Sequence, residues 1–288
     1  MTTQPLDPRR NAFRPDLADE SLRGRVAAGR FVMPQVRLVV HASTPLRDRP
    51  DPRASWTTEA LFGEVVKVLE DHDGWSWVQL QNDGYVGYMR SGALSPYVTR
   101  ATHRVRALGT FVYPEPEVKA PPIVDLPMNA EVCIAEEGLS FCRLHDGSYI
   151  PARHIAPVWQ PLRDFVDVAE RFLGVPYLWG GKSRLGLDCS GLVQVALQAC
   201  GVPAPRDSDM QGNELGAPVD VSPTFDNLQR GDLVFWRGHV GLLLDAFTLL
   251  HANAHHMCVA EEPFLAAVER IARGGSRVIG VRRMRQVA

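Results

Sequence analysis

The chain has 288 residues, of which 45% are hydrophobic and 22% are charged. This length predicts at least two domains, and this composition is typical of a folded globular chain and excludes disorder of the whole. The 31 Lys and Arg residues nearly balance the 33 Asp and Glu residues, which gives a formal net charge of -2. That balance argues against nucleic acid or an anionic membrane surface as the main partner, because both require a basic excess.

Hydrophobic runs in the sequence are short. The longest, such as Val240–Leu244, fall far below the roughly 18 residues that a membrane helix requires. Residues 1–30 mix Asp, Arg, Pro and Glu, which is unlike a secretory signal peptide. The 5 cysteines are few and odd in number, which fits free thiols in a reducing compartment better than a disulfide framework. We therefore expect a cytoplasmic protein with no membrane partner.

The first half of the chain has the pattern of small β domains. Residues 1–34 are rich in Pro and Arg, and predict an extended arm or short helix that lies over a larger body. From residue 35 to about 157, short β-type runs alternate with Gly, Asp and Pro, which is typical of small all-β barrels or sandwiches. The clearest runs are Val36–Val40, Val65–Leu69, Trp75–Leu80 and Val86–Met89.

This half also contains an internal repeat. The segment 83–96, with an Asp-Gly pair near its start and Ser-Pro at its end, resembles the segment 146–157, which starts with Asp-Gly and ends in Ala-Pro. The upstream runs Glu64–Val66 and Glu131–Cys133 match as well. The repeat predicts two small barrels in tandem, at residues 35–100 and 101–158, the second being short and degenerate. The alternative is chance similarity between β-hairpins that share Asp-Gly turns.

The second half, residues 159–288, has a different pattern. Apolar residues at helical spacing predict one helix over Asp164–Leu173 and another over Cys189–Cys200, each followed by Gly and then Pro. Strand-type runs follow at Asp232–Trp236, Val240–Leu244, Leu249–Ala252 and Val278–Val281. Helices followed by an antiparallel sheet predict an α+β domain.

A cysteine stands where the second of these helices is predicted to begin. Asp188 is of a residue type that caps helix N-termini, so Cys189 falls in the first turn. Backbone N–H groups and the positive end of the helix dipole stabilise a thiolate in that position. Gly-rich segments at 179–181 and 185–187 would allow a substrate backbone to come close. We interpret Cys189 as a nucleophile.

A nucleophilic cysteine needs a base, and two histidines on neighbouring predicted strands can supply it. His239 precedes one strand and His251 lies on the next, 251 − 239 = 12 positions later. Because this separation is even, a hairpin would place both rings on the same face of the sheet. We expect His239 to be the base and His251 to orient it.

Other reactive side chains form no convincing pattern. His255 and His256 could join Cys258 as metal ligands, but their spacing matches no standard zinc pattern and exposed loop histidines are more common. Cys200 and Cys258 have the character of buried small side chains. We find no phosphate loop, dinucleotide fingerprint or zinc-protease motif, and so expect no metal and no cofactor.

The motifs of the second half resemble those of the NlpC/P60 family of papain-like cysteine peptidases. The resemblance covers residues 160–288 in order and spacing, and it is carried by the segments 175–181, 187–193, 205–208, 231–235, 239–241 and 250–252. The preceding residues resemble the bacterial SH3-like barrels that are often joined to this catalytic domain. The resemblance thus implies two small SH3-like barrels followed by an α+β papain-like domain.

The family resemblance also implies a function. It points to hydrolysis of peptidoglycan stem peptides between γ-D-glutamate and a diamino acid, either meso-diaminopimelate or L-lysine. Cys189 matches the nucleophile, His239 the base, His251 the third polar residue, and Tyr177 a tyrosine that helps to hold the oxyanion. The subgroup with SH3-like domains accepts peptides with a free N-terminal L-Ala, which implies a role in recycling released wall peptides inside the cell.

The same subgroup implies the residues that bind substrate. By this likeness Asp188 and Ser190 flank the ligand, Ser208 lies on the facing loop, and an acid and a tyrosine of the first barrel close the end of the cleft. Glu64 and Tyr85 are our choices for that pair, since a cationic terminal amine is costly to bury without an anion. Two alternatives stay open, namely a related acyltransferase or amidase with another substrate, and a catalytically silent module that binds wall fragments.

Overall fold

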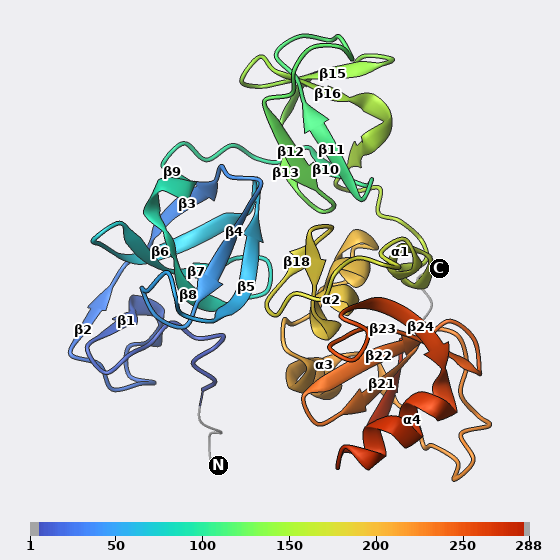
Figure 1. The fold of residues 1–288 in the computed structure, drawn as a ribbon. Coiled ribbons are helices and arrows are strands. Elements are labelled where there is room, and N and C mark those ends of the chain that lie inside the picture. The colour runs from blue at the N-terminus through green and yellow to red at the C-terminus, as the bar shows by residue number, and fades with distance from the viewer. Residues whose placement is uncertain (1–5, 285–288) are drawn as a thin grey trace. The chain divides into compact units, whose positions relative to one another are not determined.

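The computed structural model describes residues 6–284. Contacts divide the chain into two units, Met1–Val158 and Trp159–Ala288. Figure 1 shows that strands dominate the first unit and that the second combines helices with a sheet. Among residues 6–284, no helix is both long and apolar enough to cross a membrane.

A seven-stranded antiparallel sheet forms the larger part of the N-terminal unit, and its strands have the order β5-β4-β8-β7-β6-β3-β9. All four of the predicted strand runs lie in this sheet. Strand β7 is buried over most of its length, and its buried residues include Trp75, Trp77, Val78 and Leu80. The elements are β3 (Gln35–Val39), β4 (Ser43–Arg47), β5 (Trp56–Leu61), β6 (Val65–His72), β7 (Trp75–Leu80), β8 (Val86–Arg90), the 3₁₀ helix η2 (Ser91–Ala93) and β9 (Leu94–Ser95).

The N-terminal arm packs on this sheet. It contains the strands β1 (Leu17–Asp19) and β2 (Arg30–Val32), which pair in parallel, with the 3₁₀ helix η1 (Glu20–Leu22) between them. Leu17 packs in one apolar cluster with Trp77 of β7. The guanidinium of Arg14 lies 4.4 Å from the Trp77 ring centroid and pairs with Glu70 at 2.7 Å.

Residues 101–158 form three small sheets around a shared apolar core, instead of one continuous sheet. The predicted second barrel is therefore seen only as a compact β region of short strands. Its elements are β10 (His103–Val105), β11 (Gly109–Val112), β12 (Val124–Pro127), β13 (Glu131–Val132), β14 (Ile134–Glu136), β15 (Phe141–Leu144), β16 (Tyr149–Pro151), the 3₁₀ helix η3 (Ala152–His154) and β17 (Ile155–Pro157).

The sequence repeat corresponds to a repeated order of elements. In each copy an Asp side chain accepts a hydrogen bond from the backbone two residues later, at Asp83 (2.9 Å) and Asp146 (3.0 Å). The glycine that follows has a positive φ, +77° at Gly84 and +90° at Gly147. A strand, a 3₁₀ helix and a short strand then follow in both copies.

The C-terminal unit is built on a six-stranded antiparallel sheet with the order β20-β25-β21-β22-β23-β24. Helix α2 packs against β22 and β23, and α4 packs against β23 and β24. Both predicted helices and all four predicted strands are present, whereas α3, α4 and β24 were not predicted. The elements are α1 (Phe165–Glu170), β18 (Lys182–Ser183), β19 (Gly186–Leu187), α2 (Cys189–Ala199), α3 (Ser208–Glu214), β20 (Ala217–Pro218), β21 (Asp232–Trp236), β22 (His239–Leu243), β23 (Thr248–Asn253), β24 (Cys258–Pro263), α4 (Phe264–Arg273) and β25 (Val278–Arg283).

Candidate active site

Cys189 is the first residue of α2, as the sequence predicts. The side chain of Asp188 caps the helix by accepting a hydrogen bond of 2.7 Å from the backbone N–H of Gly191. The capped helix start fixes the direction of the Cys189 side chain, which is 6% exposed. Backbone N–H groups of Ser190 and Val240 donate hydrogen bonds to the Cys189 thiol. The sulfur therefore lies beside the start of β22, next to His239 in the chain.

A buried ion pair holds the capping residue in place. Arg206 donates to both carboxylate oxygens of Asp188, at 2.9 and 2.7 Å, and to the hydroxyl of Ser190 at 2.9 Å. The second Asp188 oxygen also accepts from the backbone N–H of Gly180 at 2.9 Å. These contacts position the α2 N-terminus, and the predicted role of Asp188 and Ser190 in substrate binding stays a prediction.

Glycines on both sides of Cys189 in the chain serve internal packing. A Cβ at Gly191 would lie 2.3 Å from the carbonyl oxygen of Gly181, and a Cβ at Gly181 would lie 2.4 Å from that of Gly186. Such distances exclude any side chain at these positions. We expected these glycines to make room for a substrate backbone, but in the structure the room is taken by the loop itself, which approaches α2.

The two histidines lie on adjacent strands and share one face of the sheet. The Nε2 atom of His239 lies 2.8 Å from Nδ1 of His251, which confirms that the even separation places both rings together. Strands β22 and β23 pair Leu242 with Leu250, so the same register places Gly241 opposite His251. A Cβ at Gly241 would lie 3.2 Å from the His251 Cβ, so this glycine leaves space for the ring.

Burial makes the resting site electrically neutral. It raises the pKa of the Cys189 thiol to about 12, with a smaller contribution from the Asp188 carboxylate, and outweighs the hydrogen bonds from Ser190 and Val240. Burial likewise lowers the pKa of His239 to about 3, helped by the neighbouring His251 and Arg270. We expected the helix start to stabilise a thiolate, but in this site the loss of solvent is the larger effect.

Tyr177 lies near Cys189. Its backbone bridges Leu187, two residues before Cys189, and its N–H bonds the carbonyl of Met257 at 2.9 Å. Burial raises the pKa of its phenol to about 12, and the nearby Cys189 and Asp188 add to the shift. The phenol therefore keeps its proton near neutral pH and can donate a hydrogen bond to developing negative charge.

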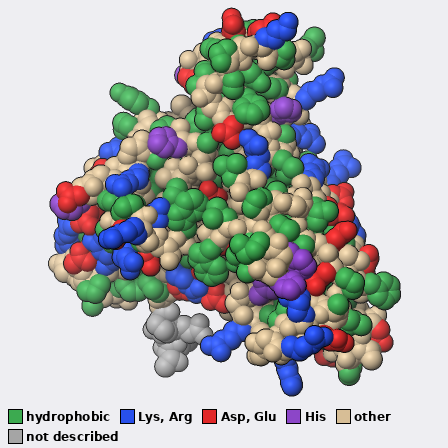
Figure 2. Space-filling view, in the orientation of Figure 1, with side chains coloured by type: hydrophobic (Ala, Val, Ile, Leu, Met, Phe, Trp, Pro, Cys, Tyr) green, Lys and Arg blue, Asp and Glu red, His purple; other side chains and the backbone are tan. Residues whose placement is uncertain are grey.

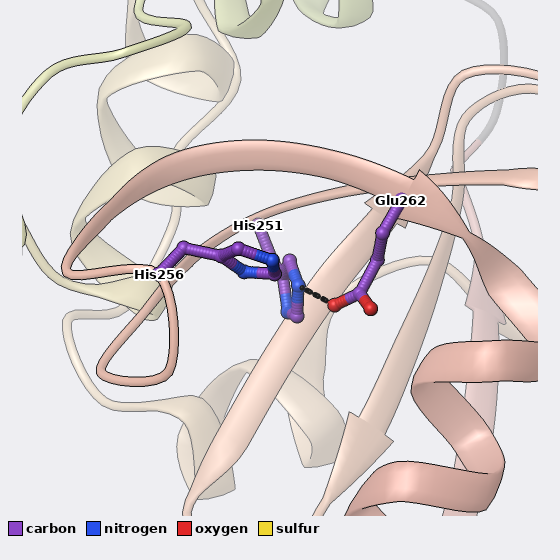
Figure 3. Close-up of side chains that lie close together, drawn as sticks. All are labelled: His251, His256 and Glu262. Carbon is purple, nitrogen blue, oxygen red and sulfur yellow. Dashed lines mark hydrogen bonds and ion pairs between the residues drawn. The ribbon is translucent and has the colours of Figure 1, made fainter.

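Two residues that we did not predict extend the histidine pair. The Nε2 atom of His251 lies 2.8 Å from Oε1 of Glu262 on β24, and Arg270 on α4 forms an ion pair with the same oxygen. Figure 3 shows the Glu262 side chain pointing toward the His251 ring. The sequence held little signal for either residue, because β24 and α4 were themselves not predicted.

The residues His251, His256 and Glu262 offer donor atoms that all lie within 4.8 Å of one another, so by composition they could hold a metal ion. His256 is exposed, and Figure 2 shows histidine side chains at the surface of the C-terminal unit. The His251 side chain, however, has 0% exposure and its Nε2 atom already bonds Glu262, whose charge Arg270 balances. We interpret these contacts as a hydrogen-bonded relay.

The remaining predicted substrate residues lie in different parts of the chain. Ser208 is the first residue of α3 and is partly exposed. In the N-terminal unit, Glu64 is buried and accepts hydrogen bonds from the Leu61 backbone at 3.1 Å and from Asn82 at 3.2 Å. Tyr85 is buried in the same unit. Their part in binding substrate stays a prediction.

Two segments of the chain match known families. Residues 46–94 match a family described as the bacterial dipeptidyl-peptidase SH3 domain, and residues 174–266 match the NlpC/P60 family. The second segment contains Cys189, His239 and His251, together with Tyr177 and Glu262.

Two relatives and one solved structure are similar to most of this chain. Dipeptidyl-peptidase 6 of Lysinibacillus sphaericus is 28% identical, and the match covers 75% of this chain and 87% of that protein. The gamma-D-glutamyl-L-lysine dipeptidyl-peptidase of Bacillus subtilis is 29% identical, and the match covers 68% of this chain and 71% of that protein. The crystal structure of an NlpC/P60 family protein from Bacillus cereus superposes with a TM-score of 0.73 at 20% identity, and covers 88% of this chain and 100% of that one. This likeness shows a shared fold.

Proposed function

We propose that this chain, which is a cysteine peptidase of the NlpC/P60 family with an SH3-like domain before its catalytic domain, hydrolyses the bond between γ-D-glutamate and a diamino acid in peptidoglycan stem peptides. The observation that carries the proposal is the placement of a helix-start cysteine near a hydrogen-bonded histidine pair, within the segment that matches the family. This arrangement is suited to acyl transfer, because it supplies a nucleophile, a base and an orienting group.

The names of the relatives support the choice of bond. Two of them are called gamma-D-glutamyl-L-lysine dipeptidyl-peptidases, and a third is called a dipeptidyl-peptidase. A dipeptidyl-peptidase releases two residues from a free N-terminus. We therefore propose a substrate that begins with L-Ala-γ-D-Glu and whose L-Ala amine is free, with lysine or diaminopimelate as the third residue.

The first chemical step uses the neutral pair in the site. His239 takes the proton of the Cys189 thiol through Nδ1, the ring nitrogen that does not contact His251, while the sulfur forms a bond to the γ-carbonyl carbon. The carbonyl π electrons move to the oxygen, and the phenol of Tyr177 donates a hydrogen bond to that oxyanion. A well-placed donor of this kind stabilises the transition state by roughly 2.7–4 kcal/mol.

The second half of the reaction returns the site to its starting state. The oxyanion collapses, the C–N bond breaks, and the His239 imidazolium gives its proton to the departing amine of the diamino acid. A water molecule then loses a proton to His239 and its oxygen bonds the carbonyl carbon. Loss of the sulfur restores the Cys189 thiol when it takes the proton back.

Substitution of the nucleophile tests the proposal. We expect Cys189→Ala to abolish cleavage of L-Ala-γ-D-Glu-diamino acid peptides and to leave their binding largely intact, because the thiol takes part only in the chemistry. Product masses from defined tripeptides and tetrapeptides, together with calorimetric binding to the variant, measure both. Wild-type turnover in the variant, or acyl transfer to an amine or lipid instead of water, would overturn the proposed function.

We also propose that the released dipeptides belong to wall-peptide recycling in the cytoplasm. Recycling handles peptides already freed from glycan, and these have the free L-Ala terminus that the proposed reaction requires. Fractionation of cells that express the full-length protein checks the location. A preference for glycan-linked stems over free peptides would contradict the role.

A further inference from the structure

The chain of hydrogen bonds in the site continues past the histidine pair. Nε2 of His239 contacts Nδ1 of His251 at 2.8 Å, and Nε2 of His251 contacts Oε1 of Glu262 at 2.8 Å. Arg270 from α4 pairs with the same oxygen of Glu262 (Figure 3 shows the His251–Glu262 bond). Three strands and one helix thus contribute four side chains that are linked in series.

The chemistry of these groups decides where the protons lie. An ionised carboxylate can only accept hydrogen bonds, so Nε2 of His251 must carry the proton of that ring. A neutral imidazole has one N–H, so Nδ1 of His251 is an acceptor and Nε2 of His239 must be the donor to it. Nδ1 of His239 is then left with a lone pair, as a base requires.

Two features keep Glu262 ionised. The guanidinium of Arg270 is always charged and pairs with the carboxylate directly. Burial raises the pKa of Glu262, but the hydrogen bonds from Arg270 and His251 outweigh that effect and lower it overall. The side chain is 12% exposed, so the pair is screened only weakly by solvent.

We propose that Glu262, held by Arg270, is a positioning residue of the peptidase that sets the proton positions on His251 and His239 and so leaves Nδ1 of His239 ready to accept a proton. The inference rests on the proposed function, because it assigns His239 as the base of that reaction. It adds a fourth group, and a fifth that supports it, to the predicted set of Cys189, His239 and His251.

Two substitutions at Glu262 and one nearby control test the relay. Glu262→Ala removes the group that accepts a hydrogen bond from Nε2 of His251, so His251 can carry its proton on Nδ1 instead. His239 can then carry its own proton on Nδ1, the nitrogen that must act as base. Glu262→Gln keeps an amide oxygen that can accept the same bond, and preserves the size of the side chain. Glu261→Gln removes the same charge one residue away on β24, where the side chain is exposed.

We expect kcat to fall at least about 10-fold in Glu262→Ala with little change in KM, and to fall less in Glu262→Gln, since removal of an outer partner of a functional histidine typically costs about 10- to 100-fold. The control should match wild type. Long-range ¹H–¹⁵N spectra of the imidazoles report the proton positions directly, and should show the His251 proton on Nε2 in wild type and in the control, and a shift toward Nδ1 in Glu262→Ala.

The spectra and the rate of Cys189 alkylation by iodoacetamide need no substrate. If the wild-type protein fails to cleave the peptides, the proposed function fails, while these two measurements still test the relay. The proposed role of Glu262 would be overturned if Glu262→Ala kept the wild-type proton positions and the wild-type rate of Cys189 alkylation. If that variant does not fold, Arg270→Gln is the second test, because it removes the guanidinium that holds the Glu262 carboxylate. Wild-type proton positions, alkylation rate and kcat in Arg270→Gln would overturn the proposed role of the Glu262–Arg270 pair.

Discussion

At the residue scale, the proposed nucleophile Cys189 and the proposed base His239 are both neutral at rest. A helix start favours a thiolate, yet Cys189 is buried, and burial raises its pKa to about 12. The same burial lowers the pKa of His239 to about 3 and that of His251 to about 4, with Glu262 opposing the shift at His251. In the proposed reaction the proton therefore moves from sulfur to nitrogen during the attack, when the substrate carbonyl takes up the developing charge.

This electrostatic arrangement predicts how activity depends on pH. His239 must be unprotonated to act as base, and burial holds its pKa well below the ordinary value of about 6.5. As pH falls from about 7, the base thus stays competent through the range in which an exposed histidine would become charged. We expect the acidic limb of kcat/KM for a defined tripeptide to lie below about pH 6.

Binding of the same tripeptide to Cys189→Ala across the pH series is the control, because it separates titration of the substrate from titration of His239. If half of kcat/KM were lost near pH 6.5 while binding stayed unchanged, the lowered pKa of His239 would be contradicted.

At the scale of elements, the start of α2 is fixed by one buried ion pair. Arg206 is 1% exposed on its side chain and Asp188 7%, and two hydrogen bonds join them. The pair ties the segment 205–208 to the loop and helix that carry Cys189. Removal of the arginine would leave the Asp188 carboxylate buried with its charge uncompensated, which is costly in a region of low dielectric constant.

We therefore expect Arg206→Leu to lower the free energy of unfolding by about 3–5 kcal/mol, and to reduce activity because the helix start loses its support. The matched control is Arg273→Gln, which breaks a pair with Glu269 whose side chains are 78% and 72% exposed. Exposed pairs contribute only about 0–1 kcal/mol. Urea unfolding of the full-length variants checks both values, and equal losses in the two would refute the structural role of Arg206.

Local signals explain which elements the sequence predicted. The caps and the Gly that follows α2 marked its ends to within a residue, and the even spacing of His239 and His251 placed both on one face. Strand β24 was missed because its second half is charged, with Glu261 and Glu262 in place of an apolar run. Helix α4 begins at Phe264 directly after Pro263, without a side-chain cap. The relay through Glu262 depends on both elements, so it could not be predicted.

At the scale of the whole molecule, an SH3-like domain and a peptidase domain share one chain. Residues 46–94 match a family named for dipeptidyl-peptidases, so the likeness to these relatives extends beyond the catalytic domain. The repeat predicted that the next residues would copy this domain. The copied part is the turn, strand, 3₁₀ helix and strand at 146–157, while the short strands of this region form three separate small sheets.

The proposed preference for a free N-terminus can be tested in the full-length protein. The terminal L-Ala amine is cationic near neutral pH, and a hydrogen bond between a charged pair contributes about 1.5–3 kcal/mol. Acetylation of that amine should therefore reduce kcat/KM by about 10- to 100-fold, since about 1.4 kcal/mol corresponds to a factor of ten. Rates for free and acetylated tripeptides of the same sequence measure the effect, and equal rates would remove the free-terminus preference from the proposal.

The same comparison tests the predicted acid of the N-terminal unit. Glu64→Gln keeps the shape of the side chain and removes its charge, so we expect the variant to lose activity on the free peptide and to discriminate less between the free and acetylated forms. Glu115→Gln, which removes an exposed charge from the same unit, should behave as wild type. Because Glu64 also accepts hydrogen bonds from Leu61 and Asn82, melting temperatures must show that the variant is folded. Full discrimination retained by folded Glu64→Gln would mean that another group binds the amine.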